Sequence, residues 1–153
     1  MIEIRPFQAE DFKLLLELAN QAVPFAAKEN AEWLEYRKAF DESKRLRRHY
    51  IAVENNMAVG YGGLEQQADD PKVLRMYVVC SPENLETETG DAPFEQLRQA
   101  ANELEATTLW AREFQADEPA RRFFTQHGFV ETRRVTPTSQ LPMVVFQLSL
   151  VAS

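Results

Sequence analysis

Hydrophobic and polar residues alternate in several short stretches of the chain, a pattern that predicts β-strands. We expect strands at residues 2–7, 49–65 (two strands), 72–80, 107–114, 129–135 and 143–150. Within 49–65, Asn55 and Asn56 tolerate the left-handed turn conformation, so this stretch predicts a β-hairpin. Residues 72–80, KVLRMYVVC, are mostly apolar and β-branched, which predicts a central strand that is buried on both sides.

Apolar residues spaced three and four apart predict helices between these strands. They are expected at residues 9–23, 29–40 and 118–127, with Asp117 as the N-cap of the last. Residues 81–105 are expected to be a polar loop that runs into a further helix, with Phe94, Leu97, Ala101 and Leu104 on its inner face. The order of elements predicts a mixed α/β (α+β) fold over residues 1–153, as a single domain. Its sheet is mostly antiparallel and has six to seven strands, flanked by about four helices on both faces.

The composition narrows the class of protein. A hydrophobic share of 44% with 27% charged residues is typical of a soluble globular chain. The net charge of −7 disfavours nucleic acid and anionic membranes as partners. With no apolar leader and no membrane-length apolar run, we expect a cytoplasmic protein. The single cysteine, Cys80, and two isolated histidines, His49 and His127, predict no metal site.

Two segments resemble the GNAT superfamily of acyl-coenzyme A-dependent N-acetyltransferases. Residues 87–92, TETGDA, match a degenerate form of its R/Q-x-x-G-x-G/A pyrophosphate loop at Gly90 and Ala92. Residues 117–129, DEPARRFFTQHGF, have Asp117 where the family often has asparagine, followed by Ala120, an aromatic pair and a Gly-Phe at the family's spacing. From the residues alone, Gly128 suits the left-handed position after a helix, and Phe129 can pack back on Phe124.

The resemblance implies acetyl-CoA as cosubstrate. Glycine lets the backbone approach a diphosphate, and the following helix start supplies N–H donors and a positive partial charge. Main-chain groups of the central strand would hold the pantetheine arm and polarise the thioester. The resemblance therefore implies cofactor contacts at Tyr77, Val78, Val79, Thr87, Thr89, Gly90, Asp91, Ala92, Asp117 and Phe124.

Acid–base catalysis needs side chains that exchange protons, and two are candidates. Glu65 at a strand end is the expected base, and Tyr77 the expected acid, because Phe124 replaces a tyrosine that is frequent in the family. The alternatives are a solvated turn residue for Glu65 and a buried core residue for Tyr77. Trp33, Tyr36 and Phe40 would line the acceptor pocket or simply pack in the core.

Two functions remain open. One is an N-acetyltransferase that transfers an acetyl group to a primary amine of a small molecule or peptide by direct attack in a ternary complex. The other is a catalytically inactive binding or interaction module with the same fold. Glu83, Glu86, Glu88 and Asp91 crowd the loop with negative charge, and Pro93, expected in the first turn of the helix, removes one backbone donor, which favours the second. A homodimer is compatible with either function.

Overall fold

The computed structural model describes residues 2–11, 13, 14, 18, 47–66, 69–80, 84, 85, 87–136 and 142–150. Of the expected helix at 9–23 it describes a 3-10 turn, η1 (Ala9–Asp11), and helical residues 13, 14 and 18. The expected helix at 29–40, with Trp33, Tyr36 and Phe40, lies outside the described residues. Glu83 and Glu86 lie outside them too.

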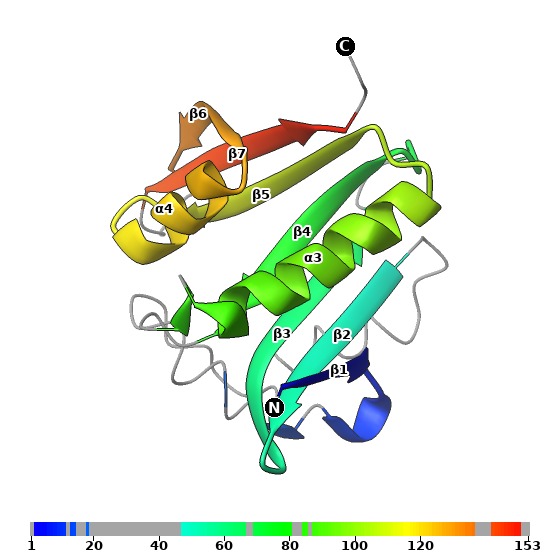
Figure 1. Ribbon diagram of the computed structural model, residues 1–153. Coiled ribbons are helices and arrows are strands. Elements are labelled where there is room, and N and C mark those ends of the chain that lie inside the picture. The colour runs from blue at the N-terminus through cyan, green and yellow to red at the C-terminus, as the bar shows by residue number, and fades with distance from the viewer. Residues whose placement is uncertain are drawn as a thin grey trace.

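Seven strands form one sheet in the order β1-β2-β3-β4-β5-β7-β6 (Figure 1). The strands are β1 (Glu3–Pro6), β2 (Arg47–Glu54), β3 (Met57–Glu65), β4 (Val73–Val79), β5 (Thr108–Phe114), β6 (Val130–Val135) and β7 (Met143–Ser149). Every neighbouring pair is antiparallel except β4 and β5. The predicted mixed, mostly antiparallel sheet is confirmed, and β4 lies in its middle.

The predicted hairpin joins β2 to β3. Asn55 has φ 53° and Asn56 has φ 63°, so both turn residues adopt the left-handed conformation. Asparagine accepts this conformation at less cost than most side chains, and such turns match the twist of the strands they join.

Two α-helices are described, α3 (Glu88–Glu103) and α4 (Glu118–Gln126), and both pack on the same face of the sheet (Figure 1). The predicted inner residues Phe94, Leu97 and Ala101 of α3 are fully buried. The sequence predicted helices on both faces: α3 and α4 cover one face, and the helical residue Leu18 packs in the apolar cluster on the other. The expectation of about four helices stays a prediction, since part of the chain lies outside the description.

The end of α4 agrees with its sequence pattern. Asp117 is the N-cap, and its Oδ1 accepts a hydrogen bond of 3.2 Å from the Ala120 N–H. Gly128 has φ 91°, and the Phe129 N–H donates to the Phe124 carbonyl at 3.0 Å. The Phe124 and Phe129 rings pack edge to face with centroids 5.1 Å apart. These bonds are those of a helix that stops at a left-handed glycine.

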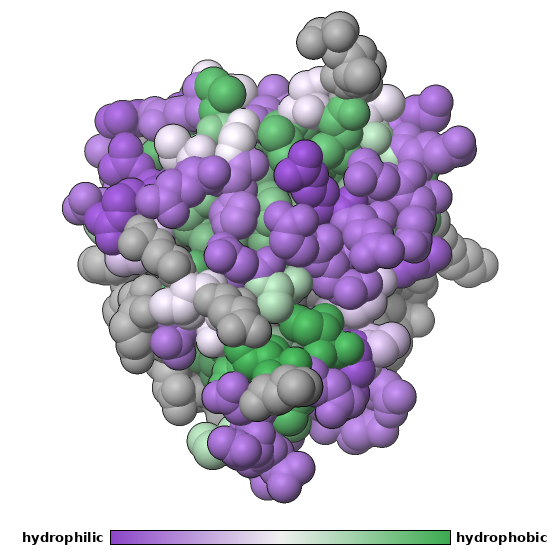
Figure 2. All heavy atoms as spheres, viewed as in Figure 1, coloured by the Kyte–Doolittle hydropathy of each residue, from purple (hydrophilic) through white to green (hydrophobic). Residues whose placement is uncertain are grey.

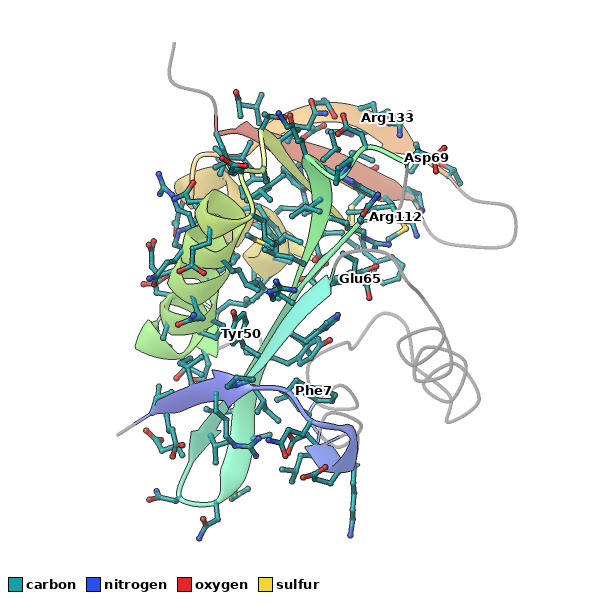
Figure 3. All side chains as sticks on the ribbon, turned by 90° about the vertical axis from the view of Figure 1, so that its right-hand side faces the viewer. Phe7, Tyr50, Glu65, Asp69, Arg112 and Arg133 are labelled. Atoms are coloured by element: carbon teal, nitrogen blue, oxygen red, sulfur yellow. The ribbon has the colours of Figure 1, made fainter. Side chains whose placement is uncertain are left out.

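The two faces of the sheet carry different clusters. The face under α3 and α4 holds the main core, which includes Phe94, Phe123, Phe124 and Phe146. The opposite face holds a smaller cluster of Phe7, Leu18, Ile51 and Tyr61. Figure 3 shows Tyr50 on the α3 side and Phe7, Glu65 and Arg112 on the other.

The outer surface on the α3 side is mainly hydrophilic, with an apolar area over β1 and β2 (Figure 2). Among the described residues, no helix combines the length and the apolar character that crossing a membrane requires.

Candidate active site

The strands β4 and β5 run together for only three residue pairs and then diverge (Figure 1). Arg75 opposite Trp110 is the last pair. From there to Val79, β3 is the only described strand that pairs with β4, while β5 continues beside β7. One main-chain edge of Tyr77–Val79 therefore faces the divergence, where the sequence placed the pantetheine contacts.

The predicted diphosphate loop is folded into the first turn of α3. Thr87 is the N-cap, and its Oγ1 accepts from the Thr89 N–H at 3.2 Å. The N–H groups of Gly90 and Asp91 both donate to the Thr87 carbonyl at 3.0 Å. Three donors that a diphosphate would use thus already have partners inside the helix start. The cofactor contacts proposed for this segment stay predictions.

Gly90 has a packing reason to be glycine. A β-carbon at this position would lie 2.1 Å from the Leu85 carbonyl oxygen, far inside van der Waals contact. Pro93 also differs from expectation: α3 begins at Glu88, so Pro93 lies inside the helix instead of in its first turn. It therefore removes no donor from the helix start, because the N–H groups that lack an intrahelical partner are those of the first turn.

The start of α3 is joined to the end of α4 by His127. Its Nε2 lies 2.9 Å from Asp91 Oδ1, and its ring stacks on Phe94 with centroids 3.9 Å apart. The predicted cofactor residue Asp91 therefore already has a polar partner.

Two predicted cofactor residues on α4 are enclosed. Asp117 is 8% exposed, and burial raises the pKa of its carboxyl, while the hydrogen bond from the Ala120 N–H opposes that rise. Phe124 is 1% exposed and packs against Phe129 and Phe146. Their contacts with a coenzyme stay predictions.

On the face opposite α3, a histidine joins two other polar side chains. The Nδ1 atom of His49 and the Tyr61 hydroxyl form a hydrogen bond, and His49 Nε2 lies 3.5 Å from Glu65 Oε1. Gly63 leaves room for the imidazole, because a β-carbon there would lie 2.7 Å from His49 Nδ1. The Glu65 side chain is 13% exposed, which argues against the solvated turn residue considered above.

No protein-family model matches the sequence, and no curated protein matches it, but solved structures do. A GNAT-family protein from Desulfovibrio desulfuricans matches with TM-score 0.81 and 14% identity, over 99% of this chain and 100% of that one. The protein yncA from Salmonella typhimurium, solved with its cofactor acetyl-CoA, matches with TM-score 0.75 and 17% identity, over 99% and 95%. The ribosomal-protein-S18-alanine N-acetyltransferase from Escherichia coli matches with TM-score 0.75 and 14% identity, over 100% and 96%.

The chain has the GNAT fold. At these identities the agreement is one of backbone architecture, and it matches the resemblance noted in residues 87–92 and 117–129. The reactions and ligands named for these proteins are properties of those proteins, and the shared fold alone does not assign them to this chain.

The GNAT fold brings the two predicted catalytic residues onto one face of the sheet. Tyr77 on β4 lies opposite Gly63 on β3, two residues before Glu65 on the same face. The predicted residues of α3 and α4 lie on the other face. The candidate site therefore spans both faces at the divergence of β4 and β5.

Sequence reasoning missed His49, which it considered only as a metal ligand. It also missed Arg75, whose guanidinium carbon lies 4.3 Å from the Tyr77 ring centroid. Both could have been found by aligning the alternation of neighbouring strands, but only once their register was known. Glycine at 63, inside a strand, was the available signal that a side chain or ligand lies close to the backbone.

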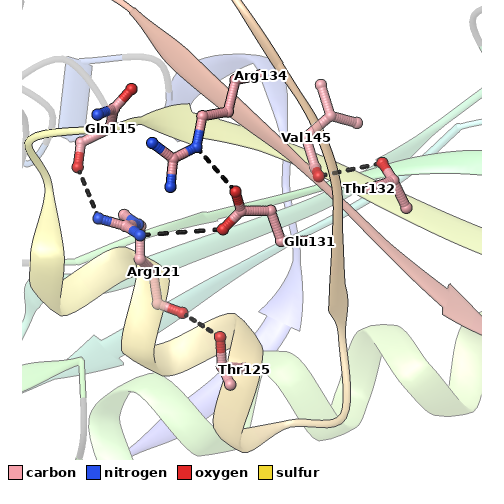
Figure 4. A network of polar contacts seen from close by, with 7 residues as sticks. All are labelled: Gln115, Arg121, Thr125, Glu131, Thr132, Arg134 and Val145. Atoms are coloured by element: carbon pink, nitrogen blue, oxygen red, sulfur yellow. Dashed lines mark hydrogen bonds and ion pairs between the residues drawn. The ribbon is translucent and has the colours of Figure 1, made fainter.

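A shallow depression of about 430 Å³ lies away from these residues, between α4 and β6. Arg121 there donates to the Gln115 carbonyl at 3.1 Å and lies 3.9 Å from Glu131, which also accepts from Arg134 (Figure 4). These contacts fix α4 to β6. The depression includes none of the predicted site residues.

Proposed function

We propose that this protein transfers an acetyl group from acetyl-CoA to a primary amine. The observation that carries the proposal is the divergence of β4 and β5 after Arg75 and Trp110, which turns one main-chain edge of Tyr77–Val79 away from strand pairing within the described sheet. The GNAT fold supports it, as does the presence of acetyl-CoA in the yncA structure.

Bound acetyl-CoA would supply the acetyl group as an activated thioester. Main-chain N–H groups of Tyr77–Val79 would hold the pantetheine arm and polarise the carbonyl, so that the two reactants are positioned together. The amine nitrogen forms the new C–N bond as the C–S bond breaks. The ammonium proton passes to a base on the protein, and the departing thiolate takes up a proton to leave as coenzyme A thiol.

Glu65 is the proposed base, with His49 as its partner. A carboxylate 3.5 Å from an imidazole can accept a proton and share it with the ring. Tyr77 is the proposed acid. The guanidinium of Arg75 over its ring favours the phenolate left after the phenol donates its proton.

A second function, a binding module without catalysis, is supported by the start of α3. Three of its N–H donors already have partners at Thr87. Asp91 adds negative charge there. A carboxylate about 6 Å from a phosphate costs about 0.7 kcal/mol at the dielectric of water and up to about 3 kcal/mol at that of a protein surface.

Binding of the coenzyme separates the two functions. Thermal unfolding would be measured with acetyl-CoA, coenzyme A and 3′-phosphoadenosine 5′-diphosphate, which lacks the pantetheine arm. Ligand at about a hundred times its Kd stabilises a protein by about 2.7 kcal/mol. We expect a rise in Tm with the first two. An unchanged Tm with saturating acetyl-CoA would defeat the transferase proposal, and a rise without thiol release from any amine would favour the binding module.

A further inference from the structure

Four large side chains form a block on the sheet face opposite α3. Arg75 and Tyr77 come from β4, and Trp110 and Arg112 from β5. Arg75 is paired directly with Trp110, and side chains two residues apart on a strand share a face. The block lies where β4 and β5 begin to diverge.

The aromatic rings hold one of the two arginines. The Arg75 guanidinium carbon lies 4.3 Å from the Tyr77 ring centroid and 5.2 Å from that of Trp110. Stacking on Tyr77, two residues further along β4, directs this guanidinium towards the stretch Tyr77–Val79 that faces the divergence. Arginine stacked in this way keeps its N–H groups for in-plane partners.

Neither arginine has an acidic partner in the part of the chain that the structure describes. The Nε atoms of Arg75 and Arg112 are buried there without a hydrogen-bond partner. Glu65 lies opposite Arg75 in the β3–β4 ladder, yet its carboxylate is placed beside His49. In the β5–β7 ladder the neighbours of Arg112 and Trp110 are uncharged, Val145 and Gln147.

The two positive charges oppose each other. Burial lowers the pKa of Arg112, and the charge of Arg75 lowers it further, although Tyr77 acts in the opposite direction. Val145 on β7 pairs with Arg112 on one side and with Arg133 of β6 on the other, so the two arginines point to the same face, and Arg133 is exposed. A protein with net charge −7 thus gathers arginines on one face of its central sheet.

We propose that Arg75 and Arg112 bind a carboxylate on the amine acceptor, so that the substrates are amines of the amino-acid class. One bound anion would accept hydrogen bonds from N–H donors that lack a partner, and its negative charge would reduce the repulsion between the two guanidinium groups. The planar fork of arginine fits a carboxylate through two parallel hydrogen bonds. The proposal rests on the proposed function, because the acceptor is the reactant assigned to this face.

The same charges exclude other acceptor classes. A polyamine or a lysine-rich peptide would bring positive charge to a face that already repels it. The sequence predicts that the coenzyme phosphates bind at the start of α3, on the other face of the sheet, so the acceptor carboxylate proposed for this face is a separate anion.

Matched acceptors test the proposal through the rate of thiol release from acetyl-CoA. L-Phenylalanine would be compared with 2-phenylethylamine, and L-lysine with 1,5-diaminopentane, because the members of each pair differ only by the carboxylate. L-Glutamate would be measured as a further acceptor that carries a carboxylate. We expect a kcat/KM at least tenfold higher for a carboxylate-bearing member than for its partner. Amines without a carboxylate that react equally well or better would overturn it.

Variants then assign the preference to the arginines. Arg112→Gln removes a charge that repels Arg75, so the variant should still fold. We expect its KM for the amino acid to rise at least tenfold, with kcat little changed. Arg98→Gln, an exposed arginine on α3, is the matched control and should change neither. A kcat/KM for Arg112→Gln equal to that of the wild-type protein would contradict the assignment.

A binding measurement keeps this proposal separate from the proposed function. Thermal unfolding with glutarate and with L-glutamate, against sodium chloride at equal ionic strength, needs no coenzyme. We expect the carboxylates to raise the Tm of the wild-type protein and not of Arg112→Gln. A Tm that rises with carboxylates but not with acetyl-CoA would support the anion site and contradict the transferase proposal. A Tm that rises with acetyl-CoA but not with carboxylates would contradict the anion site and leave the transferase proposal intact.

Discussion

The carbonyl oxygen of Leu85 occupies the position that a side chain on Gly90 would need. A β-carbon on Gly90 would lie 2.1 Å from that oxygen and 2.8 Å from its carbon. Both are backbone atoms, so no side-chain rotation can relieve the overlap. The glycine that resembles part of a diphosphate loop is therefore also required by the packing of the loop on α3.

Substituting this glycine should destabilise the fold whether or not the protein binds a coenzyme. We expect Gly90→Ala to lower the free energy of unfolding by about 1–3 kcal/mol, the usual cost of overpacking. Gly60→Ala is the control, because its β-carbon would meet atoms no closer than 3.4 Å. Urea unfolding measures both. Equal losses for the two variants would mean that the Leu85 contact is not the cause.

The buried cap of α4 should give a pH-dependent stability. Burial raises the folded-state pKa of Asp117 above its ordinary value of 3.8. Stability associated with the protonated form is fully present below that ordinary value and is lost as pH rises through the raised pKa. Asp117→Asn keeps the capping oxygen and carries no charge. Its free energy of unfolding, relative to the wild-type protein, should therefore increase as pH is raised from about 3 to 7.

Urea unfolding at several pH values measures this difference, with Glu118→Gln as an exposed neighbouring control. Asp117→Ala should instead lose about 0.5–2 kcal/mol at neutral pH, because it removes the cap. If the difference in free energy of unfolding between Asp117→Asn and the wild-type protein did not vary with pH, the Asp117 carboxyl would have the same pKa in the folded and unfolded states, contrary to the prediction.

Asp91 should weaken binding of the coenzyme by its charge. If the diphosphate binds at the start of α3, Asp91→Asn removes a repelling charge while keeping an oxygen for His127. For an exposed carboxylate about 6 Å away, the gain is about 0.7 kcal/mol, or about threefold in Kd. Calorimetric titration with acetyl-CoA measures it, and added salt should shrink it. Glu95→Gln on the exposed side of α3 is the control, and unchanged or weaker binding by Asp91→Asn would place the diphosphate elsewhere.

Catalysis should depend on the pair formed by Glu65 and His49. Removing a general base typically lowers turnover by about 10²–10⁴-fold. We therefore expect Glu65→Gln and His49→Gln each to reduce kcat on this scale, with the Tm shift by acetyl-CoA unchanged. Because the two side chains act together, the double variant should lose little more than either alone. Single variants that keep kcat within about twofold would exclude them as the proton acceptor.

Local signals were predicted well. Asn55, Asn56, Asp117 and Gly128 each act through backbone conformation or a hydrogen bond within a few residues, so their roles could be predicted from the sequence. The succession of strands and helices along the chain could be predicted from alternation and helical spacing, as could the β2–β3 hairpin and the central place of β4, whereas the full order of the strands in the sheet is known only from the structure. The extent of α3 was less accessible: its first turn begins at Glu88, in a segment expected to be a loop.

The features that were missed depend on register. His49 meets Tyr61 and Glu65 only because β2 and β3 pair with Gly63 opposite His49. Arg75 and Arg112 share a face only because β4 and β5 are paired at Arg75 and Trp110. A shift of one residue would turn each of these side chains to the other face, and alternation within a single strand does not fix that choice.

The short parallel ladder separates the sheet into two halves, with Arg75 and Tyr77 on one and Arg112 on the other. A molecule inserted between the halves would touch both and set the spacing of the two guanidinium groups. A carboxylate should already bind to the free protein, and a thioester bound between the halves should tighten that binding by fixing the spacing of the two guanidinium groups. Affinity for the acceptor would rise with occupancy of the coenzyme site, and the converse would hold by the same free energy.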